Sequence, residues 1–229
     1  MGIRLLGLRK GASQFGGGVE WEANFGHAIP FLQIDGSSPE HSIVLGVSAG
    51  VFGRFALETT KRDLISSDWV FAMPLYWRND EHWVQLSYRH ISSHLGDDYM
   101  LRFDQFSEGY MRDDVGITVF RRLGDWVGMY AGGNYAFNVD PDANRRGALT
   151  IGLEINRPVQ TPWYSGIDVY SDQDASWEPR FNLHVGRRTE FDDGRGIRVT
   201  FEMLLGPSPQ GEFRRGDVFL VATGIAIEL

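Results

Sequence analysis

Apolar and polar residues alternate with a period of two along almost the whole chain. In residues 81–94, for example, Val84, Leu86 and Tyr88 share one face, and polar side chains alternate with them. This alternation predicts β-strands with one apolar and one polar face. No stretch shows helical periodicity of useful length. We expect strands over residues 19–34, 42–58, 64–78, 81–94, 108–123, 126–138, 147–157, 163–172, 177–190, 195–205 and 213–229.

The two faces differ in the same way on most of these strands. Odd-numbered positions are mostly apolar, whereas even-numbered positions carry charged residues and many glycines. The runs of roughly 10–16 residues are long for a soluble sheet, whose strands most often have about 5–6 residues. Tight turns alternate with longer loops, as in outer-membrane barrels. Large aromatic residues cluster near strand ends, where interfacial girdles would lie: Trp69, Trp77, Trp126 and Trp163.

These features predict an all-β fold, an antiparallel up-and-down transmembrane β-barrel with the odd positions facing outward. Eleven strands are visible, and bacterial barrels of this kind have even strand numbers, so we expect twelve strands in a single domain over residues 1–229. Residues 1–12 are weakly patterned and either hold the first strand or mark a truncated start. We expect the last strand to pair with this segment, because an open edge in a membrane leaves backbone groups unsatisfied. A soluble sandwich, or a soluble lipid-binding barrel with the odd positions inside, is the alternative.

Composition argues against several other classes of protein. The chain has 30 acidic and 22 basic residues and a formal net charge of −8, whereas a nucleic-acid partner requires a clustered basic face. It has no cysteine, so it has no disulfide framework and no cysteine-based metal site. It has no run of about 18 apolar residues that would predict a transmembrane helix. Residues 1–10 lack the apolar core of a signal peptide.

Two polar residues, His90 and Ser92, lie on the apolar face of the strand at 81–94. A histidine two residues from a serine on one face places a base beside a nucleophile. If Arg78 pairs with Glu81 across the tight turn, Trp69 opposes His90 and Ser67 opposes Ser92. This register matches apolar faces on the two strands.

The next strand offers a carboxylate, because the apolar residues around Val115 face outward and so Asp113 does too. Matching the faces lets Ser92 oppose Asp113, with His90 on the diagonal, which predicts a Ser–His–Asp arrangement. His90 follows the tight turn by about ten residues, so it lies roughly 23 Å up an apolar band about 25 Å tall. The three side chains are then at the level of the ester carbonyls of outer-leaflet lipids.

The segment Ser66–Arg78, followed by His90–Tyr99 with the sequence HISSHLGDDY, resembles a bacterial outer-membrane β-barrel family known as a domain of unknown function. The resemblance covers about residue 42 to the end and is most specific over Ser92–Tyr99. It implies a location in the bacterial outer membrane and no particular activity.

The His90-x-Ser92 spacing is similar to that in outer-membrane phospholipase A and lipid A deacylases. That similarity implies that the histidine is the base and the serine is the nucleophile, on the outer wall of a barrel. Ser93 stands where those families tend to carry asparagine, which leaves the donors to the oxyanion unassigned.

Several interpretations of function remain open at this point. The first is an outer-membrane barrel of unassigned role, in which His90, Ser92 and Asp113 are ordinary interfacial residues. The second is a hydrolase of membrane-lipid acyl esters, with outer-membrane lipid as its partner, and the third is a small pore. Asp97 and Asp98 are either calcium ligands, together with loop carbonyls, or part of a solvated acidic loop. Charged residues on the even face either line a channel or form a salt-bridged plug.

Overall fold

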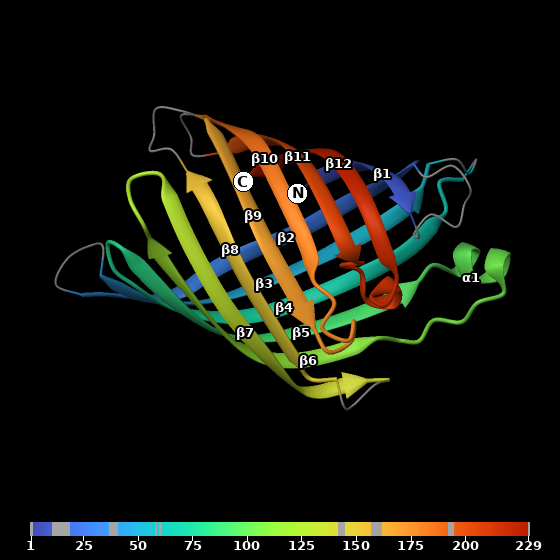
Figure 1. Ribbon diagram of the computed structural model, residues 1–229, viewed down its shortest axis with the longest axis horizontal. Helices are drawn as coiled ribbons and strands as arrows, with labels where there is room; N and C mark the ends of the chain where they lie inside the picture. Colours follow the sequence, from blue (N-terminus) through green and yellow to red (C-terminus); the bar gives the residue numbers. More distant parts are fainter. Residues whose placement is uncertain are drawn as a thin grey trace.

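The computed structural model describes residues 2–10, 19–36, 41–57, 59, 61–141, 145–156, 162–191 and 195–228, without the side chains of residues 2–10 and 156. These residues form twelve strands that close into one barrel (Figure 1). The strands are β1 Gly2–Lys10, β2 Val19–Asp35, β3 Ser42–Ala56, β4 Leu64–Arg78, β5 His82–Leu95, β6 Met111–Arg122, β7 Val127–Asp140, β8 Gly147–Asn156, β9 Trp163–Asp172, β10 Arg180–Glu190, β11 Gly196–Pro207 and β12 Asp217–Glu228.

Each strand is antiparallel to its neighbours in the chain, and β12 closes the barrel against β1. The expected twelve strands and the expected closure of the last strand on the N-terminal segment are confirmed, with Gly2 paired to Ala226. Residues 11, 12, 58, 157 and 229, which the expected strands include, lie outside the described residues. Three expected strand starts were too early by three or four residues, because β6 begins at Met111, β10 at Arg180 and β12 at Asp217.

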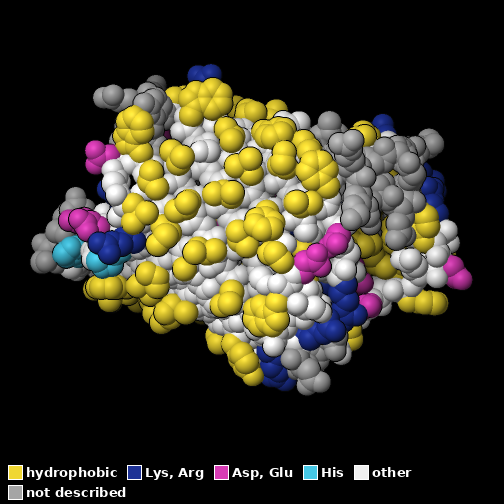
Figure 2. Space-filling view, in the orientation of Figure 1, with side chains coloured by type: hydrophobic (Ala, Val, Ile, Leu, Met, Phe, Trp, Pro, Cys, Tyr) yellow, Lys and Arg dark blue, Asp and Glu magenta, His cyan; other side chains and the backbone are white. Residues whose placement is uncertain are grey.

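The odd-numbered side chains of most strands point away from the lumen, as the alternating pattern predicts. Phe71 is 37% exposed, Phe201 46% and Trp77 51%, values that no side chain in a common core would have. Figure 2 shows apolar side chains over the front wall of the barrel, with charged side chains gathered toward its ends. This arrangement excludes the soluble barrel with odd positions inside, and it is that of a wall facing lipid.

The two ends of the barrel differ in the length of their connections. The tight turns at Asn79-Asp80 and Gly124-Asp125 lie at the end where β1 starts and β12 ends. The other end carries the longer loops, including helix α1 (Asp97–Phe103) and the 3-10 turn η1 (Gly211–Phe213) (Figure 1). We call it the long-loop end. Neither α1 nor η1 was expected from the sequence, because both are too short to show periodicity. No helix in the described ranges is long and apolar enough to cross a membrane.

Polar contacts cross-link the lumen near the long-loop end. Arg54, which is 2% exposed, forms an ion pair with Glu20 and donates to Gln210 Oε1 over 2.6 Å. Asp68 accepts hydrogen bonds from the Ser93 hydroxyl and from the Gly211 backbone, which is part of η1. These contacts tie β2–β5 to the loop between β11 and β12. They lie on the inner side of the wall whose outer side carries His90 and Ser92.

Candidate active site

The registers of β4, β5 and β6 decide which side chains surround His90. His90 lies opposite Phe71 on β4 and opposite Asp113 on β6. Ser92 lies opposite Trp69 and Met111. The expected pairs Trp69 with His90, Ser67 with Ser92 and Ser92 with Asp113 are therefore wrong by two residues, although every expected face is right.

The β4–β5 turn explains the first of these shifts. Arg78 pairs with Trp83 and not with Glu81. The Asn79 side chain accepts hydrogen bonds from the backbone N–H groups of Glu81, at 3.1 Å, and His82, at 2.9 Å. These bonds stabilise a turn longer than the two-residue turn on which the expected register rests. A two-residue shift changes each side chain's partner and keeps its face.

Asp113 is the centre of a hydrogen-bonded group on the outer wall. Its Oδ1 lies 2.8 Å from His90 Nδ1 and accepts a hydrogen bond of 2.7 Å from the Tyr88 hydroxyl. Its Oδ2 accepts a hydrogen bond of 2.9 Å from Asn138 Nδ2. The carboxylate thus holds the Nδ1 side of the imidazole, and the tautomer with a proton on Nδ1 leaves Nε2 as an acceptor. This is the His–Asp half of a serine-hydrolase triad.

A β-bulge on β7 brings Asn138 to Asp113. The β6–β7 register pairs Asp113 with Asn138 and Asp114 with Ala136, so Phe137 is the extra residue. Phe137 and Asn138 are both exposed, although side chains in a regular strand alternate between faces. Phe137 stacks on Tyr88 with the ring centroids 6.2 Å apart. The bulge therefore supplies one ring and one amide to the same site, as bulges near functional sites do.

The inner side of the same strands holds this group in place. Asp114 is fully buried, and its Oδ2 lies 2.8 Å from Arg89 Nη2 and 3.2 Å from Arg112 Nε. Arg112 also reaches Asp174, in the β9–β10 loop, at 3.4 Å. Burial raises the pKa of Asp174, and the nearby guanidinium of Arg214, followed by that of Arg112, opposes this rise. Asp113 and Asp114 thus have opposite surroundings. Asp113 points outward from the barrel, and Asp114 points into a lumen rich in arginine.

Ser92 lies on the same outward face as His90, two residues further along β5. In the described part of the chain its hydroxyl makes no hydrogen bond, and neither does His90 Nε2. His94, two residues beyond Ser92 on the same face, is exposed. The structure thus joins His90 to Asp113, but it shows no hydrogen bond between Ser92 and His90, so only the His–Asp part of the predicted arrangement is formed. Catalysis by the three residues remains a prediction.

The site lies at the edge of the apolar band that is nearer to the long-loop end. Trp69, which is directly opposite Ser92, is 54% exposed and faces outward like the aromatic residues of an interfacial girdle. Beyond it, Asp97 and Asp98 form the first turn of α1, and both are exposed. Among the described residues, no group of three His, Cys, Asp or Glu side chains is arranged to hold a metal ion. The prediction of a calcium site there remains untested.

Two members of the group were not predicted from the sequence. Tyr88 was placed correctly on the outward face, but nothing in the alternation showed that its hydroxyl would reach Asp113. Asn138 has an even number, so the alternating pattern places it on the inward face. Only the bulge turns it outward, and the sequence around Phe137 has no glycine or proline that would indicate one.

The sequence comparison decides the family. The model of the protein family of unknown function DUF1207 matches residues 9–228. The chain belongs to this family. No curated protein matches the chain in sequence.

Solved structures show the same fold at low sequence identity. Outer membrane phospholipase A from Escherichia coli is 11% identical with a TM-score of 0.70, and the match covers 100% of this chain and 91% of that chain. The Salmonella typhi outer membrane phospholipase dimer with bound calcium is 11% identical with a TM-score of 0.67, covering 99% and 90%. The KdgM porin in complex with disordered oligogalacturonate is 9% identical with a TM-score of 0.53, covering 99% of both chains. This DUF1207 chain therefore has the fold of bacterial outer-membrane β-barrels.

Proposed function

We propose that this DUF1207 protein is a hydrolase of acyl esters in outer-leaflet lipids, with Ser92 as nucleophile, His90 as general base and Asp113 as the residue that orients His90. The observation that carries the proposal is the 2.8 Å contact between His90 Nδ1 and Asp113 Oδ1 on a wall that is otherwise largely apolar. Ionisable groups on a lipid-facing surface are costly, so they mark functional sites. Here the pair has Ser92 as its neighbour on the same face.

The proposed mechanism gives each of the three residues one role. His90 Nε2 takes the Ser92 proton as the hydroxyl oxygen attacks the ester carbonyl, and a tetrahedral oxyanion forms. Collapse of this intermediate breaks the ester bond, and His90 gives its proton to the leaving alcohol. Water then attacks the acyl-serine with His90 again as the base, which releases the fatty acid and restores Ser92. Asp113 stabilises the imidazolium in both steps without accepting its proton.

The setting of the site supports this chemistry. Ser92 lies opposite Trp69, a residue type that is enriched at the membrane interface, and this supports a position of Ser92 near the lipid ester groups. Three hydrogen-bond contacts fix the Asp113 carboxylate, and an oriented carboxylate holds the imidazole in position for its role as base. The neighbours in fold include proteins named as phospholipases, and 11% identity extends that likeness to the fold only.

A pore is the weaker candidate. The fold likeness to the KdgM porin favours it, but polar contacts cross-link this lumen near the long-loop end. The contacts of Arg54 with Gln210 and of Asp68 with the Gly211 backbone hold the loop between β11 and β12 against the lumen side of β3 and β4, which argues against an open path. Single-channel recordings in planar bilayers test this alternative, and the hydrolase proposal expects no stepwise conductance.

The hydrolase proposal is tested on the purified protein in detergent micelles with phospholipid and with lipid A as separate substrates. Fatty-acid release is expected from the wild type and is expected to fall about 10²–10⁴-fold in Ser92→Ala and His90→Gln, because each removes the nucleophile or the base. The rate of fatty-acid release is expected to fall strongly in Asp113→Asn as well. A fluorophosphonate probe, which modifies activated serines, is expected to label the wild type at Ser92.

Two matched variants show whether the positions are specific. Ser67→Ala removes a hydroxyl from the same outer wall, and His94→Gln removes the histidine on the other side of Ser92. Both are expected to keep wild-type rates, because neither contacts Asp113. Background release from the wild type on both substrates, or full activity in Ser92→Ala, overturns the proposal.

A further inference from the structure

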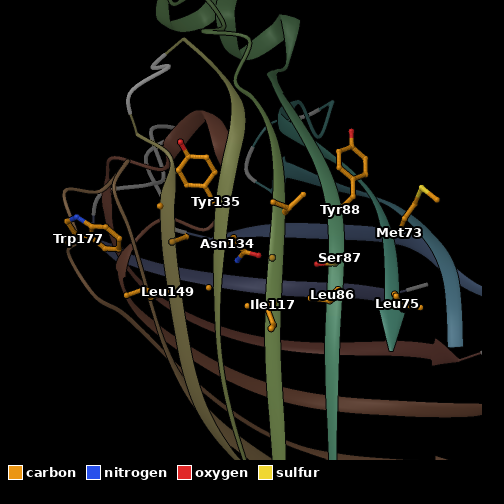
Figure 3. A pocket seen from close by; sticks show the side chains of 15 residues that line it. Met73, Leu75, Leu86, Ser87, Tyr88, Ile117, Asn134, Tyr135, Leu149 and Trp177 are labelled. Carbon is orange, nitrogen blue, oxygen red and sulfur yellow. The ribbon is translucent and has the colours of Figure 1, made fainter. Parts of the chain in front are cut away.

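An apolar groove of about 810 Å³ lies on the outer wall, on the membrane side of the candidate site. It crosses β4 to β8 and is lined by outward side chains (Figure 3). Tyr88 and Tyr135 stand toward the end of the barrel that carries α1, with Leu86 and Ile117 further down the wall (Figure 3). On β5 the groove takes in only residues 86–88, and on the neighbouring strands it takes in the residues in register with them, so it runs across the strands below the level of His90 and Ser92.

The groove exists because β7 presents no side chain at Gly133. This residue lies opposite Ile117 on β6 and opposite Leu149 on β8, both of which point outward and are about half exposed. A Cβ atom at Gly133 would lie 3.3 Å from Leu149 Cδ2 and 3.5 Å from the Ala148 carbonyl oxygen. One methyl group thus fits with a small shift of Leu149, whereas a larger side chain would extend into the groove.

The groove is continuous with the hydrogen-bonded group around Asp113. Tyr88 lines the groove, and its hydroxyl donates to Asp113 over 2.7 Å. His90 is the next outward residue on β5, followed by Ser92. An acyl chain that extends down the wall from an ester carbonyl at Ser92 therefore passes His90 and reaches the groove at Tyr88.

The chemistry of the lining selects one occupant. The lining is almost entirely apolar, and the hydrocarbon of the outer leaflet surrounds the groove, so an alkyl chain loses no hydrogen bond on entering it. We propose that this groove binds the acyl chain of the ester substrate and makes the enzyme prefer long chains. This inference rests on the proposed hydrolase function and adds the substrate feature that the site recognises.

The test is a comparison of chain lengths in variants of Gly133. Purified protein in micelles is assayed on p-nitrophenyl palmitate and p-nitrophenyl butyrate. Gly133→Leu is expected to lower the palmitate rate about tenfold or more, because pocket contacts are worth that much per lost group. The butyrate rate is expected to stay near that of the wild type. Ala131→Leu adds the same bulk on the outward face of β7 outside the groove, and it is the control.

A second readout does not depend on turnover. A phospholipid with a diazirine at the end of its acyl chain is irradiated with the Ser92→Ala variant, and the crosslinked peptides are mapped. Crosslinks are expected on β6 to β8 around Ile117 and Leu149, and they are expected to fall when Gly133→Leu is added.

The two proposals fail in different ways. If the wild type hydrolyses neither the palmitate nor the butyrate ester, the hydrolase function is overturned. Hydrolysis of both esters, with Gly133→Leu lowering the two rates equally or not at all, overturns the groove alone. Crosslinks spread evenly around the barrel wall also overturn it.

Discussion

Asp113 and Asp114 are neighbours in sequence with opposite surroundings, and the same substitution at each should have different effects. Asp114→Asn keeps the shape of a fully buried side chain and removes the charge that Arg89 and Arg112 share. Asp113→Asn removes a charge from the outer wall, where the side chain is 13% exposed. We expect Asp114→Asn to destabilise the barrel and Asp113→Asn to leave its stability nearly unchanged.

The magnitudes follow from the contacts. Removing one partner of a buried ion pair costs about 3–5 kcal/mol, because the other charge stays buried. Arg112 keeps Asp174 at 3.4 Å and the Arg146 carbonyl at 2.8 Å, so the lower part of this range applies and we expect a loss of about 3 kcal/mol. In Asp113→Asn the hydrogen bonds to the side chain become weaker, but the substitution also removes a charge that a lipid environment disfavours. We therefore expect the free energy of unfolding to change by no more than about 1 kcal/mol.

The assay is urea unfolding in detergent micelles, followed by tryptophan fluorescence and by the shift in gel mobility that accompanies unfolding. The free energy of unfolding is compared for the wild type and for the two variants under identical conditions. Equal losses at the two positions, or a larger loss in Asp113→Asn, would show that the assignment of inner and outer faces in β6 is wrong.

Two further predictions concern the long-loop end. Gly96→Ala is expected to cost about 1–3 kcal/mol of stability in the same urea assay, because its Cβ would overlap the Leu64 carbonyl group. Gly124→Ala has open space around its Cβ and is expected to change little. Burial raises the pKa of Tyr99, in α1, to about 12 from an ordinary value of 10.0. Its contribution to stability is therefore complete below pH 10 and is lost as the pH rises toward about 12. Melting temperatures measured across this window are expected to fall more in the wild type than in Tyr99→Phe, and parallel curves would contradict this account.

The architecture could be predicted from the sequence because two strong constraints act together. A period of two maintained over long strands sets which side chains face lipid, and a membrane allows no open sheet edge. Together they predict twelve strands and closure, even though β1 itself is weakly patterned. Helix α1 was missed because seven residues form too few turns to show a periodicity.

The sequence could predict on which face of the barrel wall the site residues lie, but it could not predict which residues lie opposite one another. A register error of two residues leaves His90, Ser92 and Asp113 on the outer wall and changes which of them are opposite. The β4–β5 register depends on hydrogen bonds that the Asn79 side chain accepts from the backbone of Glu81 and His82, and no hydrophobic pattern encodes those. Asn138 was beyond prediction for a related reason, because one extra residue in β7 reverses the alternation on which the prediction of faces rests.

The seam between β1 and β12 has a consequence for how the barrel folds. Ten of the eleven other pairs join strands linked by turns or short loops, and one joins β5 and β6 across α1. The seam alone pairs the two extremes of the chain, Gly2 with Ala226. Local hairpins form quickly, whereas a contact between distant residues must first overcome the entropy of closing the intervening chain. Closure of this seam is therefore the natural slow event of assembly, and until it occurs the two edge strands expose their backbone groups to any other strand they meet.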